Sequence, residues 1–252
     1  MQYRLKVGHL YPEHLNLYGD RGNLLALYQR AQARGIELEL VPIGFGDVVN
    51  PNAVDMLFMG GGQDAQQLKI AQDLPLKAPS IRESVEQGCV MLGICGGYQL
   101  MGHYYQPHEG DRIEGLHLMD CYTQASHTRM IGNIAIRRSD GHTPEGSTIV
   151  GFENHSGKTY LGVGVKPLGI VLYGNGNNGE DQTEGAVEGN LYGSYLHGAL
   201  LPKNPKLTDE LLEKAFYRRY GDSEAFPTYP ASNRIEHKAH EKALLTASHQ
   251  AK

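Results

Sequence analysis

The sequence has few cysteines and no long hydrophobic run. Three cysteines in 252 residues are too few, and of the wrong parity, for a disulfide framework, and none belongs to a C-x-x-C pair. We therefore expect reduced thiols. No apolar run approaches the 18 residues of a membrane-spanning helix, and the N-terminus lacks the apolar core and cleavage site of a signal peptide. These absences predict a cytoplasmic protein without a transmembrane segment.

Three further patterns are missing. The formal net charge of -5 provides no basic field, so nucleic-acid binding is not expected. The 12 histidines lack the spacing of a zinc site, so we predict no metal. No segment matches G-x-x-x-x-G-K-[ST], so no cofactor is expected in this chain and any ATP chemistry must reside elsewhere.

The first half of the chain alternates predicted strands and helices. Strands are expected at 3–10, 36–43, 54–59 and 90–95, and helices at 23–33, 65–74 and 78–87. This rhythm predicts an α/β fold with a central, mostly parallel sheet flanked by helices. Ligands then belong at the carboxyl ends of the strands.

The second half is richer in β-structure and glycine. Strands are expected at 117–123, 131–136, 148–153, 169–173 and 191–196, followed by a helix from an N-cap at Thr208 to about Tyr220. No linker divides the chain, so we predict one domain over residues 1–225. Residues 226–252 form a polar tail, expected to be a peripheral helix or disordered.

Cys95 lies between an apolar strand and a helix-like pattern. The spacing Gly93-x-Cys95-x-Gly97 is the cysteine form of the nucleophile elbow, in which small neighbours allow a strained turn that exposes the reactive side chain. A helix beginning there would aim backbone N–H groups at a developing oxyanion. The alternative is a buried structural cysteine. We favour the nucleophile because glycines flank it on both sides.

A cysteine nucleophile needs a base and an oxyanion hole. His197 ends an apolar strand and precedes a glycine; alone it would more often be structural, but beside an elbow cysteine it becomes the expected base. The loop Gly60-Gly-Gly62 follows a strand and can present backbone N–H groups together with Gly96. Without Cys95 this loop would indicate only a tight turn.

These residues together carry a family resemblance. The motifs that carry it are Gly60-Gly-Gly-Gln-Asp64, Gly93-Ile-Cys95-Gly-Gly-Tyr-Gln99 and Tyr195-Leu-His197-Gly198. They resemble class I (triad-type) glutamine amidotransferases of the branch shared with cobyric acid synthase. Three further segments are similar to the GatD-type subunits of lipid II isoglutaminyl synthases, namely Tyr18-Gly-Asp-Arg-Gly-Asn23, Gly151-Phe-Glu-Asn-His-Ser-Gly157 and Tyr173-Gly-Asn-Gly-Asn-Asn178.

The resemblance implies a glutaminase that forms a heterodimer. It would hydrolyse L-glutamine and deliver ammonia to a Mur-ligase-like (MurT-type) subunit, which uses ATP to amidate D-glutamate of lipid II to D-isoglutamine in peptidoglycan biosynthesis. Such a complex would bring the chain to the inner membrane face. The resemblance assigns Cys95 as nucleophile, His197 as base, and Gly61, Gly62 and Gly96 to the oxyanion.

Other site residues are less sharply implied. Arg129 falls where the family carries an arginine that binds glutamine, and a guanidinium matches an α-carboxylate; otherwise Arg129 would be a solvated strand residue. Glu153 and His155 lie in a segment that could line the same pocket. Asp20 and Asn23 could also line it, or could instead form an Asx-turn and a helix cap.

The sequence departs from the family at Ala199, where many class I amidotransferases carry the glutamate of the triad. The resemblance suggests that the ligase partner supplies a carboxylate. His197 would then be poorly oriented in the isolated chain, so we expect weak glutaminase activity alone and strong activation in the complex.

Other functions stay open. The nearest is the glutaminase part of a cobyric or cobyrinic acid amidating enzyme; those enzymes typically carry a synthetase domain ahead of the amidotransferase, whereas this signature starts near residue 1. A cysteine peptidase or related hydrolase on the same fold is a second alternative. A non-enzymatic scaffold fits poorly with the presence of both Cys95 and His197.

Overall fold

The first half of the chain builds a mostly parallel sheet. The computed structural model describes residues 3–16, 19–139, 147–230 and 232–250. The strand order of the first sheet is β11-β12-β4-β3-β1-β2, and only β11 runs antiparallel to its neighbour. Its strands are β1 (Tyr3–Leu10), β2 (Ile36–Ile43), β3 (Met56–Met59), β4 (Val90–Ile94), β11 (Ala186–Glu188) and β12 (Leu191–Ser194). The expected parallel sheet is confirmed.

Burial explains the order of these strands. Every residue of β3 and β4 is buried, as in strands covered on both faces, and these strands lie inside the sheet. The edge strand β2 alternates buried and exposed residues. The carboxyl ends of β3, β4 and β12 therefore meet at one place, at the centre of the sheet.

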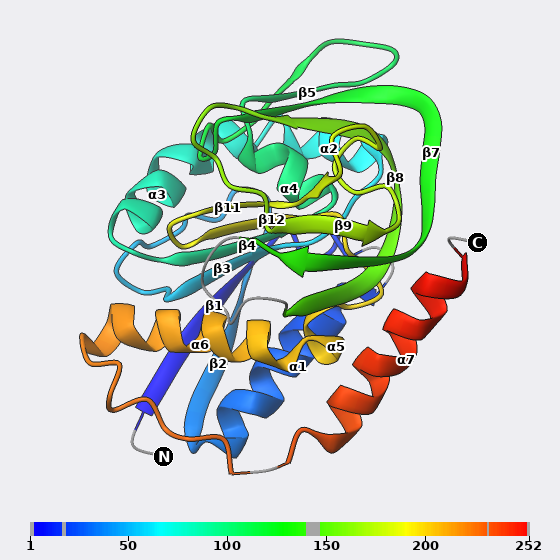
Figure 1. Cartoon of the computed structure of the whole chain (residues 1–252). Helices are drawn as coiled ribbons and strands as arrows, with labels where there is room; N and C mark the ends of the chain where they lie inside the picture. Colours follow the sequence, from blue (N-terminus) through cyan, green and yellow to red (C-terminus); the bar gives the residue numbers. More distant parts are fainter. Residues whose placement is uncertain (1–2, 17–18, 140–146, 231, 251–252) are drawn as a thin grey trace.

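Helices cover both faces of this sheet (Figure 1). On one face lie α1 (Arg21–Ala33) and α6 (Pro205–Tyr220), and on the other α3 (Leu74–Glu86) and α4 (Gly96–Met101). The short helices α2 (Asp64–Ile70) and α5 (Leu200–Lys203) follow the loops after β3 and β12. None of the helices described has the length and hydropathy of a membrane-spanning segment.

The second sheet is built around a long strand, β7. Its order is β10-β9-β7-β5-β6, with β8 also paired to β7. Its strands are β5 (Tyr104–Gln106), β6 (Ile113–Glu114), β7 (Cys121–Arg138), β8 (Thr148–Leu161), β9 (Gly169–Tyr173) and β10 (Thr183–Glu184). The two strands expected at 117–123 and 131–136 are one strand, because a bulge between Ala125 and Met130 interrupts the alternation without ending β7.

Helix α6 begins earlier than expected. Pro205 occupies its first position, where its fixed φ and missing N–H suit a helix start. Thr208 lies inside the helix, and its hydroxyl donates to the carbonyls of Leu201 and Asn204. The predicted N-cap at Thr208 is therefore wrong.

The C-terminal part of the chain lies along the second sheet. Helix α7 (Arg234–Gln250) packs against β7 and β8, as Figure 1 shows. Its Ala247 is buried against Ala135 and Val150. The Gln250 side-chain oxygen accepts hydrogen bonds from the backbone and side-chain nitrogens of Asn133.

Parts of two predicted segments lie outside the described residues. They are Tyr18 of the motif 18–23, and residues 231, 251 and 252 of the expected tail 226–252. The boundary at residue 225 stays a prediction.

Candidate functional site

Cys95 occupies a strained turn between β4 and α4. Its backbone angles, φ 50° and ψ −106°, lie outside the regions that side-chain-bearing residues favour. The turn is held by a hydrogen bond of 2.8 Å from the Cys95 N–H to the Ser194 carbonyl of β12. Strain that a surrounding structure enforces in this way is typical of catalytic positions.

The flanking glycines are required by close backbone approach. A Cβ on Gly97 would lie 2.1 Å from the Met59 carbonyl oxygen, and a Cβ on Gly93 would lie 2.5 Å from the Met101 sulfur. Any larger residue would force α4 away from β3 and β4. The turn at Cys95 therefore depends on both glycines.

His197 reaches Cys95 because β12 lies beside β4. Ser194 is paired with Ile94 in the parallel register, so both chains leave the sheet at the same level. His197 is then fixed by backbone hydrogen bonds with Phe152 of β8, from its N–H at 2.7 Å and to its carbonyl at 3.3 Å. Its side chain is fully buried.

Asp20 supplies the carboxylate that the sequence analysis assigned to a partner. Its Oδ1 lies 3.3 Å from His197 Nδ1, and both side chains are completely buried. Asp20 comes from the segment between β1 and α1, whose end is adjacent to the glycine loop after β3. The expectation that His197 lacks an orienting carboxylate within this chain is therefore wrong for this structure.

The surroundings of His197 favour its charged form. Burial lowers its pKa, but the charge of Cys95 and hydrogen bonds to Asp20 and Cys95 outweigh burial and raise the pKa to about 10. An imidazolium beside Cys95 stabilises a thiolate, which is the nucleophilic form of cysteine.

The Gly60–Gly62 loop lies against this group, but not in the role expected for each residue. A Cβ on Gly61 would lie 2.8 Å from His197 Cε1, 3.1 Å from Asp20 Oδ2 and 3.4 Å from Cys95 Cβ. The Gly61 N–H donates to Asp20 Oδ2 at 2.7 Å. Because this donor is already used, the expected oxyanion role of Gly61 is corrected to a structural one.

Gly62 and Gly96 fit the oxyanion role better. Their backbones are adjacent, since a Cβ on Gly96 would lie 2.9 Å from the Gly62 nitrogen. In the part of the chain that the structure describes, neither N–H has a hydrogen-bond acceptor. Two such donors beside a nucleophile are the arrangement that stabilises a tetrahedral oxyanion.

A cavity of about 360 Å³ opens onto Cys95. Its lining residues come from the loop after β3, from α2 and α4, and from β5, β7 and β8. They are Gly62, Gln63, Asp64, Ala65, Gln67, Cys95, Gln99, Tyr105, Arg129, Asn154, His155, Ser156 and Gly157. The structure thus brings Cys95, Gly62, Arg129 and His155 to one cavity.

His155 and Arg129 are held at the cavity by their neighbours. The His155 ring stacks on Tyr195 with 3.6 Å between ring centroids, and its Nδ1 donates to the Gly157 carbonyl at 2.8 Å. Burial lowers the pKa of His155 to about 4, so its ring is neutral at neutral pH. Arg129 Nε donates to Asn154 Oδ1 at 2.8 Å.

Two of the expected pocket residues lie elsewhere. The Glu153 carboxylate accepts hydrogen bonds from Asn175 and Gly176 and so fixes the loop after β9. The Asn23 side-chain oxygen accepts from the Leu201 N–H at 2.8 Å and holds α5 to α1. Neither lines the Cys95 cavity, because buried backbone donors of neighbouring loops bind both side chains.

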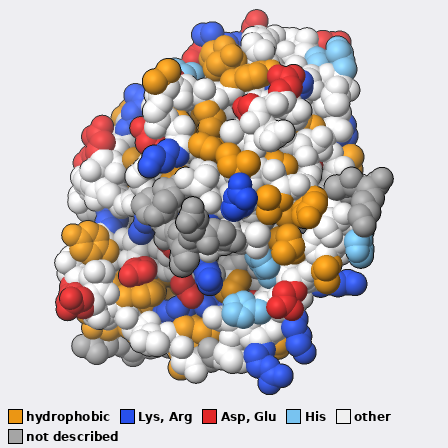
Figure 2. Space-filling model, in the orientation of Figure 1, with side chains coloured by type: hydrophobic (Ala, Val, Ile, Leu, Met, Phe, Trp, Pro, Cys, Tyr) orange, Lys and Arg blue, Asp and Glu red, His pale blue; other side chains and the backbone are white. Residues whose placement is uncertain are grey.

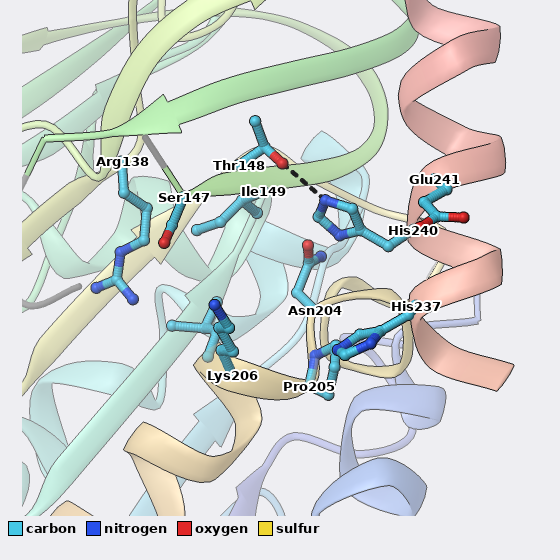
Figure 3. Close-up of a pocket in the computed structure, with 11 residues that line it drawn as sticks. Arg138, Ser147, Thr148, Ile149, Asn204, Pro205, Lys206, His237, His240 and Glu241 are labelled. Atoms are coloured by element: carbon cyan, nitrogen blue, oxygen red, sulfur yellow. Dashed lines mark hydrogen bonds between the residues drawn. The ribbon is translucent and has the colours of Figure 1, made fainter. Parts of the chain in front are cut away.

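A second cavity, of about 290 Å³, lies between α7 and the start of α6 (Figure 3). His240 of α7 contacts Thr148 there, with 2.8 Å between Nε2 and Oγ1. Neither Cys95 nor His197 lines this cavity. Among the described residues no group of three His, Cys, Asp or Glu side chains is placed to hold a metal ion. The Cys95 cavity is therefore the candidate active site.

Sequence reasoning missed several residues of this site. Asp20 was considered only as a pocket or turn residue, although its carboxylate faces His197 from 177 positions away. Asp64 and Gln67 also line the cavity, although the Gly60–Asp64 motif by itself predicts no role for either. The available signal is their position in the helix that follows the Gly60–Gly62 loop, at the end of a strand that leads to the site.

Comparison with known proteins agrees with this geometry. Residues 6–205 match the model of the CobB/CobQ-like glutamine amidotransferase domain. The chain is 42% identical to the lipid II isoglutaminyl synthase (glutamine-hydrolyzing) subunit GatD of Streptococcus pneumoniae over 90% of this chain and 86% of that protein. It is 43% identical to the subunit of the same name from Staphylococcus aureus, over 86% of each chain.

A solved structure shows the same fold at low identity. The structure of PurLQS from Thermotoga maritima contains a chain that superposes with a TM-score of 0.55 at 17% identity, covering 88% of this chain and 99% of that one. The elbow cysteine and the glycine loop at one cavity, with the buried His197 in contact with the cysteine, agree with these comparisons. The match of the family model over most of the sequence shows that this chain belongs to the CobB/CobQ-like glutamine amidotransferase family.

Proposed function

We propose that this chain is the glutamine-hydrolysing subunit of a lipid II isoglutaminyl synthase. The observation that carries the proposal is the buried Cys95–His197–Asp20 group beside the N–H donors of Gly62 and Gly96, which have no acceptor among the described residues. Similarity to GatD subunits over most of both chains supports the choice of this enzyme among amidotransferases.

Hydrolysis proceeds by acyl transfer to Cys95. The thiolate attacks the side-chain amide carbon of L-glutamine, and Gly62 and Gly96 stabilise the oxyanion that forms. His197 then donates a proton to the amide nitrogen, so ammonia leaves and a γ-glutamyl thioester remains. His197 next accepts a proton from water, which attacks the thioester and releases glutamate and the thiolate.

Arg129 and Asp20 act around this reaction. Arg129 lines the cavity and binds the α-carboxylate of glutamine through its guanidinium. Asp20 is a positioning residue: it holds the His197 ring and stabilises its charged form. The chain itself needs no cofactor for these steps.

The ammonia passes to a Mur-ligase-like (MurT-type) subunit in a heterodimer. That partner uses ATP to activate the α-carboxylate of D-glutamate in lipid II, and ammonia converts it to D-isoglutamine. Association with the partner places this cytoplasmic chain at the inner face of the membrane, where lipid II is found.

The test follows nitrogen from substrate to product. The chain is incubated with glutamine labelled with ¹⁵N in its side-chain amide, with and without the partner, ATP and lipid II. We expect glutamate release that requires Cys95, and ¹⁵N in the lipid II product only when every component is present. Cys95→Ala is the blank, and Cys121→Ala, another buried cysteine, is the matched control.

The outcomes separate the parts of the proposal. Because Asp20 orients His197 within this chain, we expect Cys95-dependent glutamate release without the partner as well. Unlabelled lipid II despite glutamate release would contradict ammonia delivery. Equal glutamate release by Cys95→Ala would contradict the assignment of the nucleophile.

A further inference from the structure

Glu184 of β10 is a buried carboxyl group that the proposed reaction does not use. The residue has no exposed surface, and it does not line the Cys95 cavity. Within the described residues no lysine, arginine or histidine forms an ion pair with it. A buried carboxyl group is costly unless its oxygens are hydrogen-bonded, so its hydrogen-bond partners indicate what it does.

The partners of Glu184 lie in the segment that joins β12 to His197. Glu184 Oε1 accepts a hydrogen bond of 2.6 Å from the Tyr195 N–H. The Ser194 hydroxyl also forms a hydrogen bond with the carboxyl group, 3.2 Å from Oε1 and 3.4 Å from Oε2. Ser194 Oγ in turn accepts from the Leu196 N–H at 3.1 Å. Two consecutive backbone donors before His197 thus depend on Glu184, one directly and one through Ser194.

The same segment also holds Cys95. The Ser194 carbonyl accepts the Cys95 N–H at 2.8 Å, so the residue whose hydroxyl contacts Glu184 also anchors the strained turn of the nucleophile. At the other end of the segment, the His197 N–H is bound by the Phe152 carbonyl at 2.7 Å. Glu184 therefore acts on the stretch of chain that connects the anchor of Cys95 with His197.

The position of Glu184 is set by the loop that carries the motif Tyr173–Asn178. The next residue, Gly185, donates its N–H to Asn177 Oδ1 at 2.9 Å, and its carbonyl accepts from Asn177 Nδ2 at 3.0 Å. A Cβ on Gly185 would lie 2.5 Å from the Gly193 carbonyl oxygen, so the backbone after Glu184 lies directly against β12. The carboxyl group therefore reaches the end of β12 from a fixed backbone.

The Glu184 carboxyl group is predominantly neutral at pH 7, because burial raises its pKa to about 8. A neutral carboxyl group has a carbonyl oxygen that accepts and an O–H that donates. A glutamine side chain offers the same pair, an acceptor oxygen and an NH₂ donor, whereas leucine has a similar size and offers neither. These two substitutions separate the hydrogen bonds of residue 184 from its volume.

We propose that Glu184 is a positioning residue for glutamine hydrolysis, which keeps His197 at its distance from Cys95. This inference rests on the proposed function. Without Glu184 the buried Tyr195 N–H would lose its acceptor, and the segment 194–196 would shift toward another one. Acyl transfer is sensitive to such a shift, since a misplacement of about 1 Å can cost about 100-fold in rate. Glutamine binding should change little, because Glu184 does not line the cavity.

The experiment compares Glu184→Leu with Glu184→Gln. Glutamate release over a range of glutamine concentrations gives kcat and KM, with the chain in complex with its ligase partner. We expect Glu184→Leu to lower kcat by about 10- to 100-fold and to change KM less than about threefold. Because Glu184→Gln keeps an acceptor for the Tyr195 N–H, its kcat should lie within about threefold of that of the unsubstituted complex.

A second measurement reports the pair of Cys95 and His197 without glutamine. The rate of Cys95 alkylation by iodoacetamide at pH 7 is followed by mass spectrometry of its peptide, because the thiolate that His197 stabilises is the reactive form. We expect alkylation to be about 10-fold slower in Glu184→Leu and nearly unchanged in Glu184→Gln. The buried Cys89 and Cys121 should stay unmodified while the chain is folded, so they are an internal control for unfolding.

Two further variants complete the design. Glu188→Leu changes an exposed glutamate of β11 and should leave kcat and the alkylation rate unaffected. Where Glu184→Leu does not fold, Ser194→Ala carries the test, because it removes the hydroxyl that contacts Glu184 and accepts the Leu196 N–H. We expect Ser194→Ala to lower kcat about 10-fold.

The contrary outcomes are distinct. Unchanged kcat and alkylation in folded Glu184→Leu, or in Ser194→Ala where that variant carries the test, would overturn the inference. A Glu184→Gln variant as slow as Glu184→Leu would also overturn it, because hydrogen bonds would then not explain the loss. Absence of Cys95-dependent glutamate release from the unsubstituted complex would contradict the proposed function, whereas the alkylation rates would still test the link between Glu184 and the Cys95 turn.

Discussion

Asp20 accepts hydrogen bonds from two parts of the site at once. Its Oδ1 faces His197 Nδ1, and its Oδ2 binds the Gly61 N–H. A carboxylate can serve two donors because both of its oxygens are acceptors. An amide cannot, since its NH₂ group would face one of the two N–H donors.

We therefore expect Asp20→Asn to lower kcat for glutamine hydrolysis by roughly 100-fold or more, because it disturbs the His197 ring and the Gly61 backbone together. Steady-state glutamate release, with and without the ligase partner, measures the effect. Asp47→Asn, which changes a loop aspartate bound to the Gly44 N–H, serves as control. Activity in the complex close to that of the unsubstituted chain would show that the partner orients His197 instead.

The residues of the site differ in how far sequence could predict them. Cys95 and His197 are marked by local patterns, because an elbow needs adjacent glycines and a base at a strand end follows from the α/β topology. The carboxylate was sought at Ala199 because family patterns place it there. Asp20 lies 177 positions from His197, and only the packing of the β1–α1 segment against the residues that follow β12 brings the two together.

At the scale of elements, the parallel half was predictable and the antiparallel half less so. Buried strands such as β3 and β4 are continuous apolar runs, so their limits are sharp. Strand β7 carries a polar bulge at 126–129 that resembles a loop in the sequence. The start of α6 was misplaced because Thr208 is a good N-cap residue, although Pro205 begins the helix three positions earlier.

Helix α7 provides a prediction at this scale. Ala247 is 1% exposed and packs on Ala135 and Val150, whereas Leu245 on the same helix is 57% exposed. Ala247→Glu would bury an unpaired carboxylate, so we expect the free energy of unfolding to fall by about 2 to 4 kcal/mol.

Urea denaturation measures this change, and Leu245→Glu is the matched control, expected within about 0.5 kcal/mol of the unsubstituted chain. If Ala247→Glu and Leu245→Glu had the same small effect, the packing of α7 against β7 and β8 would be excluded as a source of stability.

At the scale of the whole molecule, buried titratable groups dominate the expected pH dependence. Figure 2 shows acidic, basic and hydrophobic side chains interspersed on one face, without a field of one sign. Exposed groups with ordinary pKa values contribute little to the linkage between pH and stability. The strongly shifted groups are therefore the ones to consider.

Four of these groups place the maximum of stability near pH 6.5. Burial lowers the pKa values of His9 and His155 to about 4, so the unfolded chain binds more protons than the folded chain between pH 4 and 6.5, and stability rises there. Burial raises the pKa of Glu184 to about 8, which lowers stability between pH 4.5 and 8. The pKa of His197 is raised to about 10, so this residue also lowers the stability of the folded chain as the pH rises above 6.5.

Below pH 6.5 the gain in stability from His9 and His155 exceeds the loss from Glu184 as the pH rises. Above pH 6.5 both Glu184 and His197 lower the stability. Each lowered histidine corresponds to roughly 3 kcal/mol across its window. Urea denaturation from pH 4.5 to 9 measures the curve. Glu184→Gln should flatten the fall between pH 6.5 and 8, and a stability that rises steadily to pH 9 would contradict the assignment.

Because Asp20 has two partners in the site, the position of the β1–α1 segment affects the rate of glutamine hydrolysis. This segment ends at Asp20, which does not line the cavity. The Asp20 carboxylate nevertheless accepts hydrogen bonds from His197 and from the backbone of Gly61, next to the oxyanion donor Gly62. A displacement of a few tenths of an ångström there would weaken the hydrogen bonds of Asp20 to His197 and to Gly61 together, since hydrogen bonds weaken steeply with misalignment. Because Asp20 does not line the cavity, a change in the position of this segment would alter kcat for glutamine hydrolysis without competing with the substrate.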